Sequence, residues 1–452
     1  MSTVLPNDFE QYFRARWCDK DVDILLQGLD KEPSTSIRLN ARRLPVDTVI
    51  EGDDGRVPWC PEGVYLKERP MFTADPLMHA GAYYVQEASS MFLAHVLRSI
   101  LPSSSFATAL DLCAAPGGKS TILRSLLPDD CLFIANEPLR PRAQVLAENM
   151  AKWGHPNVIV TQSYAAEITD FIAKNNTSIQ GFDLILADVP CSGEGMMRKE
   201  SEAVRQWSPS FVAECASLQR SIVADIWPAL RPDGILIYST CTFNPEEDED
   251  NVEWIARELG ADIIPIPVDP TWGIRGDMRK HPYQPSSLNP QPSTPNFCHF
   301  LPGLVRGEGF FLAVLRKKAE AHENDGSIAV SSPNEHRKQK KEKGKGHRNA
   351  PPMTLADRVR SSLSALPTNQ LDSTDAPCVD LTLVDAIRYL QREVLILPPD
   401  APRGIVQVCY CGQRLGLVKN LGTRANNLYP KEWRIRTTHL VPHSLIPEIL
   451  GR

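Results

Sequence analysis

The chain has 452 residues, of which 42% are hydrophobic and 23% are charged, a composition that is ordinary for a soluble protein of two or three domains. It holds no uninterrupted run of about 18 apolar residues and no apolar stretch near its start, so we expect neither a membrane span nor a secretory signal. The 11 cysteines are scattered, which predicts free thiols in a reducing cytoplasm, and the net charge of −6 gives no global sign of a nucleic-acid partner.

Residues 1–70 are predicted to form a helical lead-in to the main domain. Short amphipathic helices are indicated over 7–29, and residues 36–40 alternate between polar and apolar side chains as a strand does. Proline and glycine are frequent over 57–76, so we expect loops there.

Residues 71–318 are predicted to form the main domain, because strands and helices alternate along them. Apolar runs with the character of buried strands lie at 107–113, 131–136, 157–161, 182–187 and 234–239. Helix-length segments separate them at 118–127, 139–152, 165–174 and 209–230. This alternation predicts an α/β domain with a mostly parallel sheet and helices on both faces. A last strand pair is predicted near 296–301 and 309–315.

Residues 319–352 have the composition of a flexible basic linker. Between Arg337 and Arg348 there are seven Lys or Arg residues and one Glu, with few apolar side chains. A plain solvated tether and a tether that also touches RNA phosphates are both consistent with this composition.

Residues 353–452 are apolar enough to fold as a separate C-terminal domain. Residues 401–440 contain only one acidic residue, Glu432, but many Lys and Arg residues. These basic residues are Arg403, Arg414, Lys419, Arg424, Lys431, Arg434 and Arg436. Tyr429 and Trp433 lie among these charges, and aromatic rings beside cations are common in RNA-binding sites. The alternative is a small domain with an ordinary basic rim.

A turn of glycines and small residues follows the first strand of the main domain and opens a helix. It consists of Cys113, Ala114, Ala115, Pro116, Gly117, Gly118 and Lys119. Such a turn lets the backbone approach a ligand, and the helix N-terminus adds the positive end of its dipole. A phosphate-binding P-loop is excluded, because it needs a glycine where Cys113 stands. The next strand ends at Glu137, which suits hydrogen bonding to ribose hydroxyls, so we expect a nucleotide-type cofactor here unless the turn is purely structural.

Two cysteines follow the ends of two later strands. Cys191 comes after Asp188-Val189-Pro190, and Cys241 lies in Thr240-Cys241-Thr242. If these strands are neighbours in a parallel sheet, both thiols lie at the sheet edge where doubly wound folds bind ligands. Carbon 5 of cytosine becomes nucleophilic only after a thiolate adds to carbon 6, and this covalent catalysis explains a pair of thiols better than core packing does. Asp188, with a pKa raised by burial, is the expected proton donor near N3.

These motifs resemble the RNA 5-methylcytosine methyltransferases of the Nop/Sun/Fmu (RsmB/RsmF-like) family. The resemblance rests on segments at 36–40, 83–91, 111–120, 188–195 and 239–247. The tail over 415–433 resembles the C-terminal domain of the bacterial RsmF branch, so the resemblance covers about 7–318 and 355–440.

The resemblance implies a Rossmann-like, S-adenosylmethionine-dependent methyltransferase core with an N-terminal RNA-positioning segment and a C-terminal PUA-like domain. Cys241 matches the nucleophile and Cys191 the cysteine that assists product release, while residues 113–119, Glu137 and Asp188 match cofactor contacts. The implied substrate is a cytosine of 16S, small-subunit ribosomal RNA. We expect a cytoplasmic monomer that binds RNA or the small ribosomal subunit, with no metal, no DNA and no membrane.

One position departs from the family pattern, and two other functions remain open. The family usually carries an acidic residue for the adenine amino group after its third strand, where this chain has Tyr164. An RNA-binding ribosome assembly factor with a non-catalytic methyltransferase fold is the first alternative, although the intact Cys191 and Cys241 count against it. A nicotinamide-dependent enzyme is the second, and it would leave both cysteines unexplained.

Overall fold

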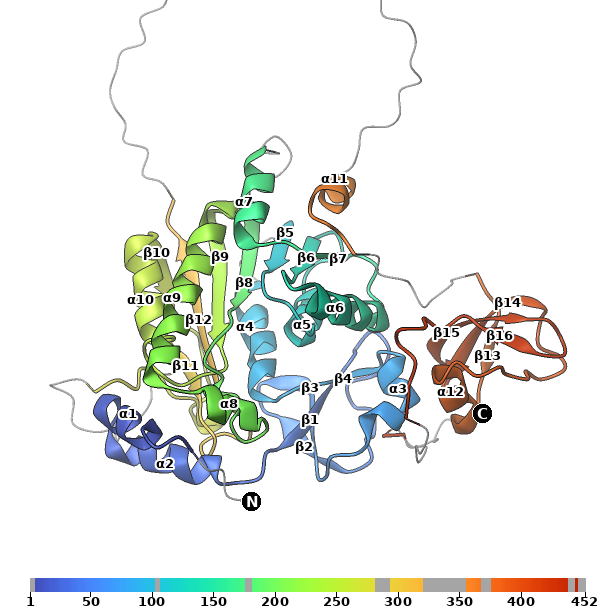
Figure 1. Cartoon of the computed structure of the whole chain (residues 1–452), viewed down its shortest axis with the longest axis horizontal. Coiled ribbons are helices and arrows are strands. Elements are labelled where there is room, and N and C mark those ends of the chain that lie inside the picture. Colours follow the sequence, from blue (N-terminus) through green and yellow to red (C-terminus); the bar gives the residue numbers. More distant parts are fainter. Residues whose placement is uncertain are drawn as a thin grey trace, which may run out of the picture.

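The computed structural model describes residues 5–101, 106–174, 181–280, 293–319, 355–366, 375–437 and 444–445. Apart from residue 319, the expected basic linker lies outside these residues. Three sheets organise the described part of the chain, and Figure 1 shows them as an N-terminal unit, a central core and a separate C-terminal unit. No helix in the described ranges is both long enough and apolar enough to cross a membrane.

The N-terminal unit combines two helices with a four-stranded sheet in the order β2-β3-β1-β4. Its elements are α1 (Phe9–Arg16), α2 (Asp19–Leu29), β1 (Thr35–Leu39), β2 (Asp53–Val57), β3 (Cys60–Leu66), α3 (Pro76–His79) and β4 (Tyr83–Val85). The loops expected over 57–76 are therefore wrong in part, because β3 lies there. The boundary expected at residue 70 also lies too early, since β4 pairs with β1 and completes this sheet.

The core is an eight-stranded sheet in the order β10-β12-β9-β8-β5-β6-β7, with β11 paired to β12. Its strands are β5 (Thr108–Asp111), β6 (Leu132–Asn136), β7 (Ile159–Thr161), β8 (Phe182–Asp188), β9 (Leu230–Thr240), β10 (Ala261–Ile264), β11 (Cys298–Phe300) and β12 (Phe310–Lys317). The five strands from β9 to β7 are parallel, and β12 runs antiparallel beside β9. This confirms the expected α/β class and the late strand pair.

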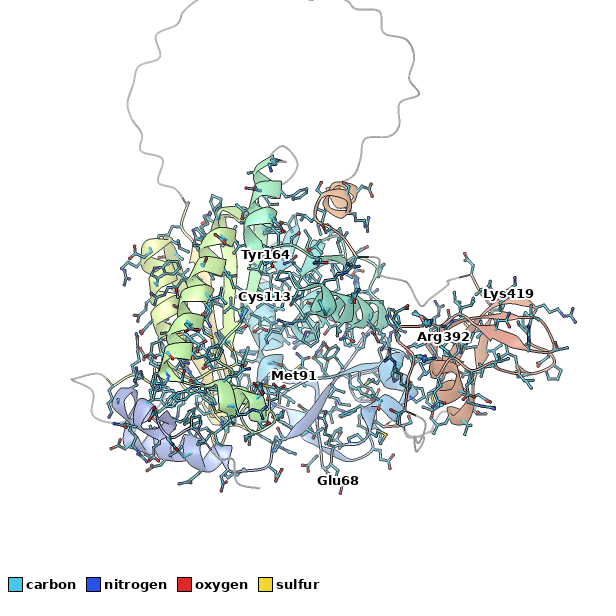
Figure 2. All side chains as sticks on the ribbon, viewed as in Figure 1. Glu68, Met91, Cys113, Tyr164, Arg392 and Lys419 are labelled. Atoms are coloured by element: carbon cyan, nitrogen blue, oxygen red, sulfur yellow. The ribbon has the colours of Figure 1, made fainter. Side chains whose placement is uncertain are left out.

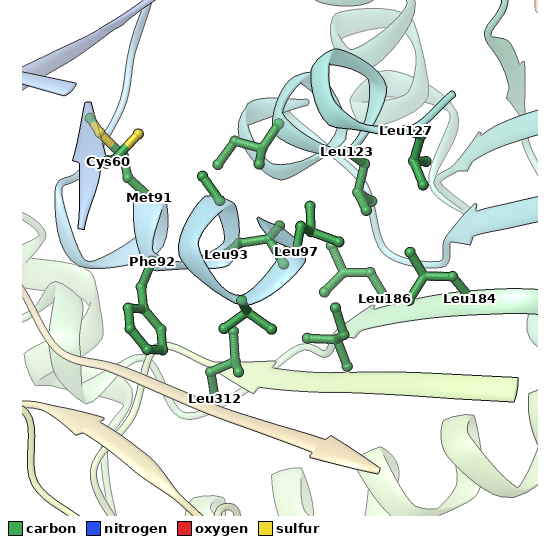
Figure 3. Close-up of a cluster of buried hydrophobic side chains, with 14 of the residues drawn as sticks. Cys60, Met91, Phe92, Leu93, Leu97, Leu123, Leu127, Leu184, Leu186 and Leu312 are labelled. Atoms are coloured by element: carbon green, nitrogen blue, oxygen red, sulfur yellow. The ribbon is translucent and has the colours of Figure 1, made fainter. Parts of the chain in front are cut away.

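Helices cover both faces of the core sheet, as the alternating pattern predicts. They are α4 (Phe92–Ile100), α5 (Gly118–Leu126), α6 (Arg140–Trp153), α7 (Ala165–Lys174), α9 (Pro209–Ile226) and α10 (Glu249–Glu258). The short helix α8 (Ser201–Gln206) instead packs on the apolar cluster of α1 and α2. On one face, Leu93 and Leu97 of α4 lie in the same buried cluster as Leu186 of β8 (Figure 3). The other face packs on a second cluster that includes Val223 of α9. The sheet is thus buried on both sides, which holds its strand ends in fixed places.

Helices α1 and α2 close the core near the end of β9. Phe9 packs edge-on against Trp207, with ring centroids 5.0 Å apart, and Phe13 lies 6.4 Å from Phe243. The Tyr12 hydroxyl also donates to the carboxylate of Glu246 at 2.5 Å. The start of the chain therefore braces the loop that follows Cys241.

The segment 355–366 belongs to the core, although the sequence predicts that the tail domain begins at residue 353. Val359 of helix α11 (Leu355–Ser362) and Leu363, the first residue after the helix, are buried in the core cluster of β7 and α7. Just beyond it, the backbone N–H of Leu366 donates to the carbonyl of Val160 in β7 at 2.9 Å. Since β7 is the last strand in the order of this sheet, the returning chain covers an open edge.

In its described residues, 375–437 and 444–445, the C-terminal unit is a four-stranded sheet in the order β13-β14-β15-β16 with one helix. Its elements are β13 (Cys378–Asp380), α12 (Leu383–Leu390), β14 (Gly404–Tyr410), β15 (Gln413–Asn420) and β16 (Ala425–Asn427). Tyr429 is only 1% exposed and packs against Tyr389, with ring centroids 5.4 Å apart. Tyr429 is therefore not available to stack on RNA bases, because its ring is part of the core of this unit.

Leu363 follows the linker in sequence but packs on the core, so removing its side chain should destabilise the core. Leu363→Ala deletes a side chain that is 2% exposed, so we expect a loss of about 2–4 kcal/mol in the free energy of unfolding. Ser362→Ala, on the exposed side of the same helix, is the matched control and should change it by less than about 0.5 kcal/mol. Equal stabilities of the two variants in urea denaturation would contradict the packing of α11 on the core.

Candidate active site

The two cysteines singled out in the sequence meet at one edge of the core sheet. Strands β8 and β9 are parallel neighbours, with Asp188 in register with Ser239, so both strands end at the same level. The Sγ atoms of Cys191 and Cys241 lie 3.3 Å apart, within hydrogen-bonding distance for sulfur. The expected meeting of the two thiols is confirmed.

The two thiols have different surroundings. The hydrogen bond to Cys241 and burial hold the pKa of the Cys191 thiol well above its usual range, so Cys191 is a neutral S–H group. The charge of Cys241 acts on Lys119, which shows that the ammonium and this sulfur lie near each other. Cys241 is therefore the better placed of the two to act as a nucleophile.

Lys119 and Asp188 form an ion pair beside the thiols. Lys119 Nζ donates to Asp188 Oδ2 at 2.9 Å, and Ser239 Oγ donates to Asp188 Oδ1 at 2.7 Å. Burial opposes the charge of Lys119, but the charge and hydrogen bond of Asp188 outweigh it and raise the lysine pKa. The protonated Asp188 expected from the sequence does not fit this arrangement, because both of its oxygens accept hydrogen bonds and one faces a cation.

Two buried glutamates hold the loops of the two cysteines together. Glu194, in the loop after Cys191, accepts hydrogen bonds from the backbone N–H groups of Phe243 at 2.7 Å and Asn244 at 3.1 Å. Glu247, in the loop after Cys241, accepts in return the backbone N–H of Ser192 at 3.0 Å. We call this reciprocal arrangement the glutamate brace, since each loop supplies the carboxylate that binds the other.

Further contacts complete the glutamate brace. The side chain of Asn244 donates to both carboxylates, at 3.0 Å to Glu194 and 2.7 Å to Glu247. The backbone N–H of Gly195 donates to the carbonyl of Cys241 at 2.9 Å, and a Cβ atom at Gly195 would meet that carbonyl oxygen at the same distance. Only glycine lets the two loops approach this closely.

Sequence reasoning missed Glu194 and Glu247 as members of this site. Burial raises the pKa of Glu247 to about 7, and the charge of Glu194 adds to the effect. Burial raises the pKa of Glu194 as well. The available signal was their regular placement, three residues after Cys191 and six after Cys241, within the two quoted motifs.

The glycine turn and the end of β6 form a second part of the site. Gly117 has a φ of 116°, a left-handed conformation that suits glycine, and it leads directly into α5. Asp111, at the tip of β5, is fully buried; Ser120 Oγ donates to its Oδ2 at 2.6 Å. Burial raises the pKa of Asp111 to about 7.

Two buried carboxylate oxygens beside the glycine turn lack a hydrogen-bond partner within the described part of the chain. They are Asp111 Oδ1 and Glu137 Oε2. Glu137 is 1% exposed, its other oxygen accepts from the backbone N–H of Leu139 at 3.1 Å, and Arg142 Nη2 lies 3.4 Å from Oε2. An unsatisfied buried acceptor is costly, so a ligand that donates hydroxyl or amino hydrogens fits here.

Tyr164 follows β7 at the same edge of the sheet, with a side chain that is 63% exposed (Figure 2). Its backbone N–H donates to Glu167 Oε2 at 2.8 Å. Its neighbour Ser163 is held inside by a hydrogen bond from its N–H to Asn136 Oδ1 at 3.0 Å. At the position where the sequence analysis expects an acidic side chain, the structure therefore has an exposed aromatic ring.

One group of possible metal ligands occurs among the described residues, behind the site. Ligand atoms of Asp248, Glu249 and His299 lie within 4.8 Å of one another, and all three residues are buried. Burial holds the pKa of Asp248 well above its usual range, and Thr240 Oγ1 donates to it at 2.6 Å. Glu249 lies 2.9 Å from His299 Nε2. These pairings leave one buried atom of each residue without a hydrogen-bond partner among the described residues: Asp248 Oδ2, Glu249 Oε2 and His299 Nδ1. The absence of a metal stays a prediction.

The raised pKa of Glu247 predicts how stability depends on pH. Its pKa rises from an ordinary 4.5 to about 7 on folding, so the folded state holds this proton more tightly than the unfolded state. The protonated Glu247 therefore contributes to the free energy of unfolding in full below pH 4.5, and this contribution is lost as the pH rises through 7. Glu247→Gln cannot ionise and should remove up to about 3 kcal/mol of this dependence between pH 5 and 8.

Urea denaturation at several pH values measures this effect. Glu258→Gln is the control, because Glu258 is an exposed glutamate on α10. It should leave the pH dependence as it is in the parent protein. A Glu247→Gln variant with the slope of the parent would show that Glu247 ionises normally in the folded protein.

Comparison with known families assigns all three units. Residues 99–316 match the family described as 16S rRNA methyltransferase RsmB/F. Residues 5–88 match the N-terminal domain of 16S rRNA methyltransferase RsmF, and residues 376–435 match the methyltransferase RsmF PUA domain. These bounds agree with the three sheets, including the extension of the N-terminal unit to β4.

Individual relatives are named after the same RsmF type of methyltransferase. Ribosomal RNA small subunit methyltransferase F of Cronobacter sakazakii is 32% identical over 330 residues, which cover 70% of this chain and 64% of that protein, just under two thirds of its length. The protein of that name from a Shewanella species is 26% identical over 469 residues, covering 91% of this chain and 92% of the relative. The crystal structure of NSun6 from Pyrococcus horikoshii with SFG shares the fold, with a TM-score of 0.53 and 19% identity over 70% of this chain and all of that one. The chain belongs to the RsmB/F family of 16S rRNA methyltransferases, as a member of the RsmF type with its N-terminal and PUA domains.

Proposed function

We propose that this protein transfers a methyl group from S-adenosylmethionine to carbon 5 of a cytosine in 16S ribosomal RNA. The observation that carries the proposal is the pair of thiols 3.3 Å apart at the tips of β8 and β9, beside the Lys119–Asp188 ion pair. The names of the relatives, ribosomal RNA small subunit methyltransferase F, support the substrate. We expect the enzyme to act as a monomer in the cytoplasm. Bisulfite mapping of 16S RNA from cells with and without the gene tests the substrate directly.

The cofactor is expected to lie along the glycine turn, residues 113–119, and the end of β6. The unsatisfied Glu137 Oε2 is placed to accept hydrogen bonds from ribose hydroxyls, and Asp111 Oδ1 is free to accept from an amino group. When bound, S-adenosylmethionine supplies an electrophilic methyl group on a sulfonium sulfur. The NSun6 structure was solved with SFG, an analogue of this cofactor, which supports the same chemistry in a protein of the same fold.

Cys241 is proposed to open the reaction. Its thiolate adds to carbon 6 of the cytosine, forming a C6–S bond and moving the ring electrons toward N3. Lys119, beside Cys241 and held by Asp188, is the group placed to neutralise the charge that develops on the ring. Asp188 then orients this cation rather than donating a proton itself. Carbon 5 has become an enamine-like nucleophile and takes the methyl group.

Cys191 is proposed to act in release. A base removes the carbon 5 proton, the electrons of that C–H bond restore the C5–C6 double bond, and the C6–S bond breaks. The leaving group is the Cys241 thiolate, and the neutral Cys191 thiol lies 3.3 Å from that sulfur, where its S–H stabilises the departing charge. Attack and release thus depend on different cysteines.

The division of labour predicts two different defects. Cys241→Ala should be inactive and form no covalent RNA adduct, because no thiolate reaches carbon 6. Cys191→Ala should still attack and transfer the methyl group but stall at release, so an RNA-linked species should survive denaturing gel electrophoresis. The double variant should behave as Cys241→Ala alone, since the steps are sequential.

Cys131→Ala is the control for loss of a buried thiol, because Cys131 directly precedes β6 and is not part of the sulfur pair. It should retain activity and trap no RNA. If Cys241→Ala traps an RNA adduct and Cys191→Ala does not, then Cys191 is the nucleophile and Cys241 acts in release. If neither variant traps RNA and both methylate, the covalent mechanism is wrong; RNA binding without any methylation by the parent protein would favour an assembly factor.

The exposed Tyr164 predicts weaker cofactor binding than the family pattern provides. Tyr164→Asp restores an acidic acceptor for the adenine amino group, and one hydrogen bond to a charged acceptor contributes roughly 1.5–3 kcal/mol. We expect about a tenfold or larger gain in affinity for S-adenosylmethionine by calorimetric titration. Tyr164→Phe keeps the ring and is the control. If Phe preserves affinity while Asp lowers it, the adenine is held by stacking on the ring instead.

A further inference from the structure

The two thiols of the active site lie closer together than methyl transfer alone requires. The sulfurs of Cys191 and Cys241 are 3.3 Å apart, and both cysteines are free thiols. Two thiols at this separation need only a small further approach to form a disulfide. The pair therefore also has the arrangement of a redox switch, in which the bonded and the free sulfurs are two states of one site.

The glutamate brace keeps the two sulfurs together. Glu194 accepts two backbone N–H groups of the Cys241 loop, and Glu247 accepts one from the Cys191 loop. The backbone N–H of Gly195 also donates to the carbonyl of Cys241 at 2.9 Å. Because the two loops are fixed to each other, a reaction between their sulfurs is an intramolecular step with a high effective concentration.

A small oxidant can reach this pair more easily than most other thiols of the chain. Cys191 and Cys241 are partly exposed, whereas five other cysteines are buried. The buried ones are Cys60, Cys131, Cys215, Cys298 and Cys409. Lys119 lies near the Cys241 sulfur, and its cation can stabilise the hydroxide that leaves when a peroxide is cleaved there.

We propose that a peroxide converts Cys191 and Cys241 into a reversible disulfide, and that this bond switches methylation off. The Cys241 thiolate, the nucleophile of the proposed mechanism, attacks one peroxide oxygen, becomes a sulfenic acid and releases hydroxide. The Cys191 thiol then attacks the Cys241 sulfur; the S–S bond forms, the S–O bond breaks, and water leaves with the proton of the thiol. Two electrons pass from the thiol pair to the peroxide, and a dithiol reductant returns them.

The disulfide occupies both groups on which the methylation mechanism depends. Cys241 cannot add to carbon 6 while its sulfur is bonded to Cys191. The bond also protects the nucleophile, because a sulfenic acid without a neighbouring thiol is oxidised further to a sulfinic acid, which thiol reductants do not reverse. The inference rests on the proposed function only for the effect on methylation, since the disulfide itself can be observed without RNA.

The test treats the full-length protein with hydrogen peroxide, alkylates the remaining thiols and maps the peptides by mass spectrometry. The peptides of Cys191 and Cys241 should be joined, with the loss of two hydrogen atoms. Methylation of a 16S RNA transcript should fall at least about tenfold, because the nucleophile is blocked. Dithiothreitol should release the joined peptides and restore most of the methylation. If both cysteines are still alkylated after the activity has fallen, the switch is wrong.

Two variants separate the thiol pair from general oxidation. Cys191→Ala keeps the nucleophile but lacks the second thiol, so peroxide should take Cys241 to the sulfinic acid, with two added oxygen atoms that dithiothreitol does not remove. This result is read by mass alone, because Cys191→Ala is expected to stall at release. Cys131→Ala removes a buried thiol outside the pair and should lose and regain methylation as the parent protein does. A Cys241 that resists further oxidation equally well in Cys191→Ala and in the parent protein would overturn the role of Cys191.

The switch and the proposed function fail in different ways. A protein that forms the Cys191–Cys241 disulfide but never methylates RNA when reduced would defeat only the proposed function. A protein that methylates equally well before and after peroxide treatment, with both thiols free, would defeat only the switch. RNA affinity measured by filter binding should be unchanged by oxidation, because the phosphate contacts that dominate it do not involve sulfur. A loss of affinity equal to the loss of methylation would assign the peroxide effect to RNA binding and overturn the switch.

Discussion

The glutamate brace is the constraint on which the arrangement of the thiols depends. Sheet register alone brings the ends of β8 and β9 to one level, but Cys191 lies three residues beyond β8, on a loop that could point elsewhere. Glu194 and Glu247 remove that freedom by accepting the backbone N–H groups of the opposite loop. A 3.3 Å separation between sulfurs is therefore a property of two loops fixed as one body.

This constraint concentrates negative charge in a buried place, and the surroundings show how it is tolerated. Each carboxylate receives several N–H or O–H donors, which offsets part of the loss of water. The part of the desolvation cost that these donors do not offset raises the pKa values of Glu194 and Glu247. Burial and the repulsion between the two carboxylates favour one shared proton on this pair of glutamates. Glu246, next in sequence, faces outward and binds Tyr12 and Arg16 of α1 instead. The N-terminal helix is thereby coupled to the loop of Cys241.

The sequence predicted what depends on the order of residues along strands. The parallel sheet, the meeting of Cys191 with Cys241 and the turn that opens α5 all follow from apolar runs and what comes after each run. It did not predict features that depend on which side chains meet in space: the ion pair that makes Asp188 an acceptor, or the burial of Tyr429. Composition also did not predict that residues 355–366 return to cover β7, because the sequence of a short amphipathic helix does not specify which surface it packs on.

The core holds the reacting groups rigidly, whereas the two outer units can contact RNA farther from the site. The core sheet is packed on both faces and sets the distances between reacting groups, which chemistry needs to within fractions of an ångström. RNA is far larger than this site, so contacts that only orient it can lie on other units at longer range. The PUA domain meets the rest through a few polar contacts and a shared apolar cluster that includes Leu77 and Leu445. Contacts of the outer units can thus orient the RNA while the core alone sets the distances between the reacting groups.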